Sequence, residues 1–155
     1  MKINWKQLLI SLAIPLAVGA LGALLSGGMN DYKIMVRPPL SPPGWVFPLV
    51  WTVLYLLMGY ASYLVYTSGK PKDEIKTALT FYVAQLVLNL LWPIVFFGFG
   101  WYLVAFFVLV ALWALILLTI RKFSAINERA GDLLLPYILW VTFAGYLNLG
   151  VFLLN

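Results

Sequence analysis

The side chains that could carry chemistry within the apolar stretches of this chain are amides, indoles and phenols, all of them neutral. The 155 residues include no cysteine and no histidine, which removes thiolate nucleophiles, imidazole bases and the usual transition-metal ligands. The five carboxylates lie at or beyond the ends of the apolar stretches, at Asp31, Asp73, Glu74, Glu128 and Asp132. A charge near the centre of a bilayer costs at least about 2.5–3.5 kcal/mol and usually marks an ion or proton pathway. We therefore expect no metal site and no proton coupling through intramembrane carboxylates.

The neutral polar and aromatic residues recur at helical spacing. Three apolar stretches each carry such a face, with steps of three or four residues: Phe47, Trp51, Tyr55 and Gly59; Gln85, Asn89, Trp92 and Phe96; and Tyr137, Trp140, Ala144 and Asn148. Amides that faced lipid would leave hydrogen-bonding groups unpaired, so Gln85, Asn89 and Asn148 are expected to point into the protein. The three faces then converge and predict a cavity with aromatic walls and a few amide groups.

Two interpretations of these faces stay open. Amides between membrane helices often only join the helices, at about 0.6 kcal/mol each on average, and for Gln85 and Asn89 this is as well supported as ligand contact. Trp51 and Trp140 lie about two helical turns inside their stretches, deeper than the usual interfacial anchor. For these two we favour a place in the cavity, where stacking on a flat conjugated ligand adds about 0.5–1.5 kcal/mol per aromatic contact.

The elements that must position these faces are membrane-spanning helices. Charged residues make up 10% of the chain and hydrophobic residues 64%, whereas a soluble domain carries about 25% charged residues. A span needs about 20 apolar residues and must satisfy its own backbone hydrogen bonds, as a helix does. We predict an all-α membrane protein with a single domain, residues 1–155, whose five spans lie at about 5–25, 45–66, 77–97, 101–120 and 133–154.

The first of these spans is predicted to be a retained helix. Its uncharged run over 8–25 is longer than the apolar core of a signal peptide, which is about 7–15 residues. Gly19 and Ala23 are four residues apart, a spacing that lets helix backbones approach closely. They predict either a seam within the bundle, slightly favoured, or a dimer face.

Residues 26–44 form a long connection between the first two spans, and we predict that it is a lid over the cavity. Long loops in compact domains are usually lids or disordered linkers. Prolines at 38, 39, 42 and 43 restrict the backbone and lower the entropy lost on ordering. Apolar residues such as Tyr32 and Met35 give the segment something to pack with, which favours the lid.

The basic residues predict the orientation in the membrane. Eight of the ten fall on the side that holds the N-terminus, and only Lys33 and Arg37 fall on the other. Since basic residues in short loops stay inside, we predict an integral protein of the plasma membrane with a cytoplasmic N-terminus and an outside C-terminus. The net charge of +5 is scattered at helix ends instead of forming a stripe, so no nucleic-acid partner is expected.

Several segments, in order along the chain, are similar to one known family. They read SPPGWVFPLVW at 41–51, LY at 54–55, MGY at 58–60, QLVLNLLWPIVFFG at 85–98, PYILW at 136–140 and AGYLN at 144–148. Together they span most of the chain and resemble the TspO/translocator-protein family, the tryptophan-rich sensory proteins also called peripheral-type benzodiazepine receptors.

The resemblance implies a five-helix bundle, generally dimeric, with a pocket closed by the first loop. The family binds porphyrins such as protoporphyrin IX, haem-related tetrapyrroles, sterols in some members, and isoquinoline carboxamides and benzodiazepines. Positions that match its pocket are Pro42, Pro43, Trp51, Asn89, Trp92, Trp140, Ala144 and Leu147. In some bacterial members the tryptophans that match Trp51 and Trp140 are implicated in light- and oxygen-dependent breakdown of protoporphyrin IX.

One part of the family pattern is missing. In animal members the sterol-recognition stretch of the last helix has a basic residue after a tyrosine, whereas no Lys or Arg follows Tyr146 here. Residues 64–70 satisfy a looser sterol pattern, which is weak wherever it occurs. A sterol is therefore the least supported of the ligands that the resemblance implies.

The function that we predict is a membrane receptor or scavenger for tetrapyrroles. It needs no cofactor, with porphyrin as ligand or as substrate of a photo-oxidative breakdown at Trp51 and Trp140. The binding residues that we expect are the eight family positions together with Tyr55, Gln85 and Asn148 from the helical faces. The alternatives are a porphyrin or sterol transporter, or a sensory or assembly subunit that acts through a membrane partner. A homodimer in the lipid bilayer is expected in each case.

Overall fold

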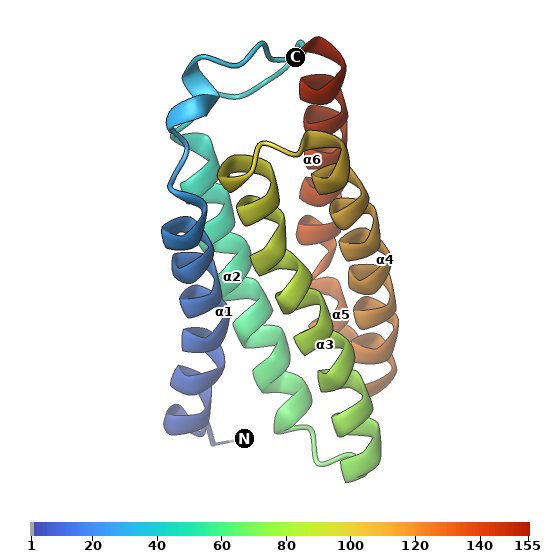
Figure 1. Cartoon of the computed structure of the whole chain (residues 1–155). Coiled ribbons are helices and arrows are strands. Elements are labelled where there is room, and N and C mark those ends of the chain that lie inside the picture. The colour runs from blue at the N-terminus through green and yellow to red at the C-terminus, as the bar shows by residue number, and fades with distance from the viewer. Residues whose placement is uncertain (1) are drawn as a thin grey trace.

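Residues 2–155 are described by a computed structural model, and within them the regular structure is entirely helical (Figure 1). Five helices are long and apolar enough to cross a membrane, which confirms the predicted class. The elements in order are α1 (Trp5–Ser26), η1 (Asn30–Lys33), α2 (Val46–Tyr66), α3 (Lys72–Pro93), η2 (Ile94–Gly98), α4 (Tyr102–Ile126), α5 (Glu128–Asp132) and α6 (Leu135–Leu154). The two ends of the chain lie at opposite ends of the bundle.

Two helices extend beyond the predicted spans into charged sequence. The third begins at Lys72 instead of 77, with Asp73 and Glu74 in its first turn, where acidic side chains are favoured by the helix dipole. The fourth continues past 120 to Ile126. The sequence prediction stopped at the charges, whereas a helix runs on through residues of high helix propensity after it leaves the apolar layer.

Helices α1 and α2 approach each other closely because glycines lie at their contact. A Cβ on Gly59 would lie 2.7 Å from the Leu12 Cα and 2.7 Å from the Ser11 carbonyl oxygen, and a Cβ on Gly19 would clash with the ring of Tyr55. Gly19 therefore lies in a seam between α1 and α2, as the first alternative predicts, whereas Ala23 is exposed and a dimer face stays a prediction. This seam fixes the distance between the walls of the cavity described below.

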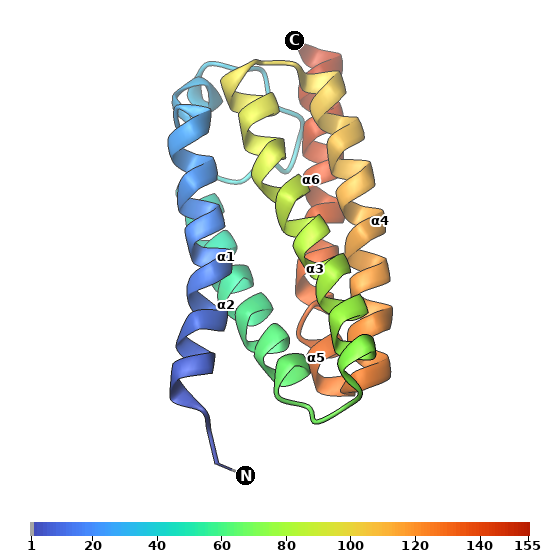
Figure 2. The ribbon, with the colours of Figure 1, turned by 60° about the horizontal axis from the view of Figure 1, so that its bottom comes forward.

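The remaining helices pack around an apolar centre. Met58, Leu112, Ile116 and Phe123 are fully buried, and Tyr137 of α6 is 1% exposed. Helix α4 packs against both α3 and α6 on the side away from α1, and Figure 2 shows α1 and α4 at opposite edges of the bundle. As a result the extensive contacts of α1 are with α2, α3 and η2, and a cavity lies between α1, α2 and α3.

The connection between α1 and α2 is fastened to the end of α6. The hydroxyl of Tyr146 donates to the Pro39 carbonyl (2.6 Å), and the Asn155 side chain accepts from the Val36 N–H (3.1 Å) and donates to the Val36 carbonyl (2.7 Å). In Figure 1 the segment lies at the same end as the C-terminus. Its action as a lid stays a prediction.

Candidate functional site

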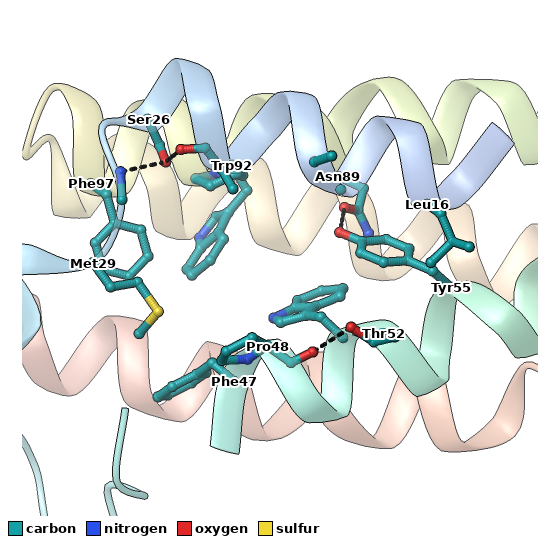
Figure 3. Close-up of a pocket in the computed structure, with 16 residues that line it drawn as sticks. Leu16, Ser26, Met29, Phe47, Pro48, Thr52, Tyr55, Asn89, Trp92 and Phe97 are labelled. Carbon is teal, nitrogen blue, oxygen red and sulfur yellow. Dashed lines mark hydrogen bonds between the residues drawn. The ribbon is translucent and has the colours of Figure 1, made fainter. Parts of the chain in front are cut away.

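A cavity of about 440 Å³ lies between α1, α2 and α3, beside the start of the α1–α2 connection (Figure 3). Four of the predicted site residues line it: Trp51, Tyr55, Asn89 and Trp92. Phe47 and Pro48 face Trp92 across the space, and Met29 and Phe97 lie at one end of it. The lining is mostly apolar and aromatic with few polar groups, as in most small-molecule sites.

The cavity opens sideways. Ala20 and Ala23 of α1 and Pro48 and Thr52 of α2 line the cavity and are also exposed on the outside of the bundle. An apolar opening between two spanning helices faces acyl chains when the protein lies in a bilayer.

The inner end of the cavity is closed by a chain of hydrogen bonds. The Tyr55 hydroxyl donates to Asn89 Oδ1 (2.9 Å), Asn89 Nδ2 donates to the Tyr137 hydroxyl (2.7 Å), and Tyr137 donates to Gln85 Oε1 (2.6 Å). Figure 3 shows the first of these bonds at the end of the cavity away from Met29. Gln85 is 1% exposed and lies outside the cavity lining. The four side chains thus tie α2, α3 and α6 together, and of the four only Tyr55 and Asn89 line the cavity.

Trp51 presents its indole to the cavity. Its ring stacks on Tyr55 (5.6 Å between centroids) and meets the edge of Tyr137 (6.1 Å). Within residues 2–155 its N–H takes part in none of the side-chain hydrogen bonds, whereas Tyr55, Asn89 and Trp92 are all paired. The Trp51 N–H therefore has no hydrogen-bond partner among the described residues.

Trp92 is held in place from the other side. Its Nε1 donates to Asn148 Oδ1 (2.9 Å), and Asn148 Nδ2 donates to the Tyr102 carbonyl (2.8 Å). Asn148 is 1% exposed, so its amide joins helices and orients the indole that forms the cavity wall.

The end of α3 changes its winding at this wall. Pro93 is followed by the π-helical turn η2, an element that occurs often at functional sites. The wider turn places Phe97 on the cavity, while Phe96 stacks on Trp92 from behind (5.0 Å). A regular four-residue spacing, used for the sequence prediction, assigned the cavity to Phe96 instead.

A second, much smaller cavity of about 30 Å³ lies under the connection, next to α6. Ala144, Leu147 and Asn148 line it, and these predicted site residues do not reach the larger cavity. Three aromatic residues line both spaces and separate them: Phe47, Trp92 and Phe97. The sequence predicted one cavity between three faces, whereas the structure has two spaces with an aromatic partition.

The remaining predicted site residues line neither of the two cavities. Trp140 packs behind the partition, 5.7 Å from Phe47 and 5.7 Å from Phe143, and its buried Nε1 has no hydrogen-bond partner. The Pro42 carbonyl accepts a hydrogen bond from the Tyr32 hydroxyl, which folds the connection on itself. Pro43 is exposed. Trp51 and Trp140, paired in the sequence prediction, thus occupy different environments.

Helix α1 supplies a wall that the sequence reasoning did not assign to the site. Leu16, Gly19, Ala20 and Ala23 line the larger cavity. The signal was present in the spacing of Gly19 and Ala23, which was interpreted as a contact surface alone. Small residues can also leave space between helices. Here Gly19 packs against Tyr55, and Ala20 and Ala23 leave room for the cavity.

Known proteins of one family are similar to this chain over nearly its full length. The model of the TspO/MBR family matches residues 11–154. The tryptophan-rich protein TspO of Chlorobaculum tepidum is 37% identical over 97% of this chain and 98% of its own. The tryptophan-rich sensory protein of Cereibacter sphaeroides is 38% identical over 100% and 95%, and the translocator protein of Bos taurus is 36% identical over 87% and 82%. Because the family model spans nearly all of the five-helix bundle, including every residue from Phe47 to Asn148 placed at the two cavities, this chain belongs to the TspO/MBR family.

Proposed function

We propose that this membrane protein binds tetrapyrroles such as protoporphyrin IX in the cavity between α1, α2 and α3. The observation that supports this most is the combination of a lateral opening with an aromatic lining and one unpaired indole N–H, at Trp51. A volume of about 440 Å³ lies in the range of about 300–1,000 Å³ that is usual for small-molecule sites. The flat tetrapyrrole ring matches this apolar, aromatic lining, whereas the two propionate groups of protoporphyrin IX must lie at the opening, because no basic residue lines the cavity.

In this proposal the ring enters between α1 and α2 and lies against the indoles of Trp51 and Trp92. Asn89 and Tyr55 meet the inner edge of the ligand. Gln85, which the sequence also assigned to ligand contact, supports Asn89 through Tyr137 instead. The same aromatic walls suit isoquinoline carboxamides and benzodiazepines, which we propose compete with the porphyrin for this space.

Filling the opening is expected to block porphyrin binding without unfolding the protein. Ala20 is exposed and lines the cavity, so in Ala20→Phe the new ring occupies space that the ligand needs. Titration of protoporphyrin IX into the detergent-solubilised protein, followed by quenching of tryptophan fluorescence, should give an affinity at least about tenfold weaker, since loss of two aromatic contacts and their burial exceeds about 1.4 kcal/mol.

The matched control for this variant is Ala17→Phe. Ala17 is also exposed on α1 but does not line the cavity, and its variant should bind like the wild type. Equal affinity of Ala20→Phe and Ala17→Phe would place the porphyrin elsewhere and refute the proposed site.

A photo-oxidative breakdown of the bound porphyrin is a second candidate, supported by the stacking of Trp51 on Tyr55 (5.6 Å). In this step light excites the porphyrin, which takes an electron from the indole beside it. The reduced ring adds dioxygen across one methine carbon–carbon bond and returns the electron to the indole. That bond breaks and leaves two carbonyl groups, so dioxygen is the net oxidant. Trp51 lines the cavity whereas Trp140 lies behind Phe47, so the two substitutions should differ. Under illumination in air, Trp51→Phe should slow the decay of porphyrin absorbance several-fold and Trp140→Phe should slow it less.

The decay must be compared at equal occupancy, so that a loss of binding is not taken for a loss of chemistry. Trp101→Phe, which replaces an exposed indole outside the cavity lining, controls for the number of tryptophans. Decay rates that are unchanged in Trp51→Phe would remove the photochemical role and leave the binding proposal standing.

A further inference from the structure

A groove rimmed by lysines lies at the other end of the bundle, where α2 passes into α3. Its volume is about 900 Å³, and it is lined by the last residue of α2, the α2–α3 connection and the first three turns of α3. Figures 1 and 2 show this connection at the end of the bundle that holds the N-terminus, away from the α1–α2 connection. The groove is therefore separate from the cavity assigned to porphyrin.

The floor of the groove is an apolar track along α3. Ile75, Leu79 and Val83 line it at four-residue spacing, which puts them in one row on the helix. Ile75 and Leu79 are half-buried against the core, while Val83 is 56% exposed. Tyr66, at the end of α2, stands beside this row and is 53% exposed.

The mouth of the groove carries a concentrated positive charge. Lys70, Lys72 and Lys76 all line it and all are exposed. Asp73 and Glu74, the carboxylates nearest to these lysines in the sequence, do not line the groove, although Asp73 is one helical turn from Lys76. Its lining therefore attracts anions, and three lysines share one opening.

We propose that this groove binds one anionic phospholipid, such as phosphatidylglycerol, with its phosphate at the three lysines and an acyl chain along Ile75, Leu79 and Val83. From Ile75 to Val83 the apolar row rises roughly 12 Å. Half of the hydrocarbon layer measures about 15 Å, so the row covers most of the length of one acyl chain in a single leaflet. Basic clusters beside spanning helices recognise anionic lipids in this way.

The proposal is tested by counting lipids retained on the full chain in native mass spectrometry. Phosphatidylglycerol and phosphatidylcholine with the same acyl chains are titrated into the detergent-solubilised protein. Phosphatidylglycerol should bind the wild type at least about tenfold more tightly, and the triple variant Lys70→Gln/Lys72→Gln/Lys76→Gln should lose this preference. Higher salt should weaken the preference as well, because the headgroup contacts are exposed.

The matched control removes the same charge from the same side of the bundle. Arg121→Gln/Lys122→Gln/Arg129→Gln changes three exposed basic residues of α4 and α5 that do not line the groove, and it should keep the wild-type preference. An equal loss in this control would mean that net charge, not the groove, selects the lipid, and would overturn the proposal.

A second arm separates a lipid from a free anion. Val83→Ser shortens the apolar row at an exposed position, and should weaken phosphatidylglycerol several-fold while leaving the lysines in place. The soluble headgroup glycerophosphoglycerol should compete poorly, since it has no chain to lie along α3. Full competition by the headgroup, or no effect of Val83→Ser, would reduce the groove to a general anion site and refute the lipid assignment.

Discussion

Asn89→Leu is expected to lower the free energy of unfolding by about 2 kcal/mol and to weaken porphyrin binding about tenfold. The Asn89 amide is the middle member of the chain from Tyr55 to Gln85, since it accepts from one tyrosine and donates to the other. Leucine has nearly the same size but leaves the Tyr55 hydroxyl without an acceptor, and an unsatisfied buried polar group costs about 1–3 kcal/mol. Stability can be measured by unfolding the protein in mixed micelles of a denaturing detergent, with circular dichroism as the signal.

A double-mutant cycle distinguishes this cause from a simple change of shape. Asn89→Leu leaves the Tyr55 hydroxyl without an acceptor, and Tyr55→Phe removes that hydroxyl. The double variant should therefore be more stable than the sum of the two single losses predicts. Average hydrogen bonds between membrane helices are worth only about 0.6 kcal/mol. Strict additivity in the cycle would show that the hydrogen bond between Tyr55 and Asn89 is as weak as this average. The chain of hydrogen bonds would then not hold the inner end of the cavity together.

Gly59→Leu should destabilise the protein further, by about 3 kcal/mol, and abolish porphyrin binding. The atoms that a side chain would meet, the Leu12 Cα and the Ser11 carbonyl oxygen, are backbone and cannot rotate away. The helices must then separate, and overpacking of this kind costs about 1–3 kcal/mol or more. Because Gly59 is one turn from Tyr55, the displacement also moves the α1 wall away from the ligand.

Gly145→Ala provides the matched control for this substitution. A Cβ at Gly145 would have only the Leu109 Cδ2 nearby, at 4.0 Å, so the variant should unfold and bind like the wild type. Should Gly59→Leu also keep its stability, the close approach of α1 and α2 would not be what sets the width of the cavity.

The number and kind of spans could be predicted from the sequence because the bilayer imposes both. A backbone in lipid has to form helices, and their length follows from the thickness of the apolar layer. The burial of the amides followed from the same argument, and Gln85, Asn89 and Asn148 are 1%, 4% and 1% exposed. The bilayer does not accept unpaired backbone or amide groups. The predictions that rest on this constraint, the helical spans and the buried amides, are confirmed.

The division of the site into two spaces could not be predicted in this way. Helical spacing places Trp92 and Phe96 on one face, but it assumes a uniform turn, whereas the π-helical turn after Pro93 moves Phe97 to the cavity. Spacing also says nothing about which neighbour a face meets. Tyr137 turns out to hold Gln85 and Asn89, and Phe47 lines the cavity with Trp51 while it packs against Trp140. Only a three-dimensional arrangement separates cavity-lining residues from supporting ones.

The gap between α1 and α2 also determines how binding should be measured. A hydrophobic dye that enters through the side of the protein is drawn from the amount dissolved in the membrane, not from the buffer. The apparent dissociation constant should therefore rise in proportion to added lipid when the total quantity of porphyrin is held fixed, and become constant when it is expressed as a mole fraction of the vesicle. Encounter then becomes a two-dimensional search, whose rate depends on lateral diffusion and on the fluidity of the surrounding chains.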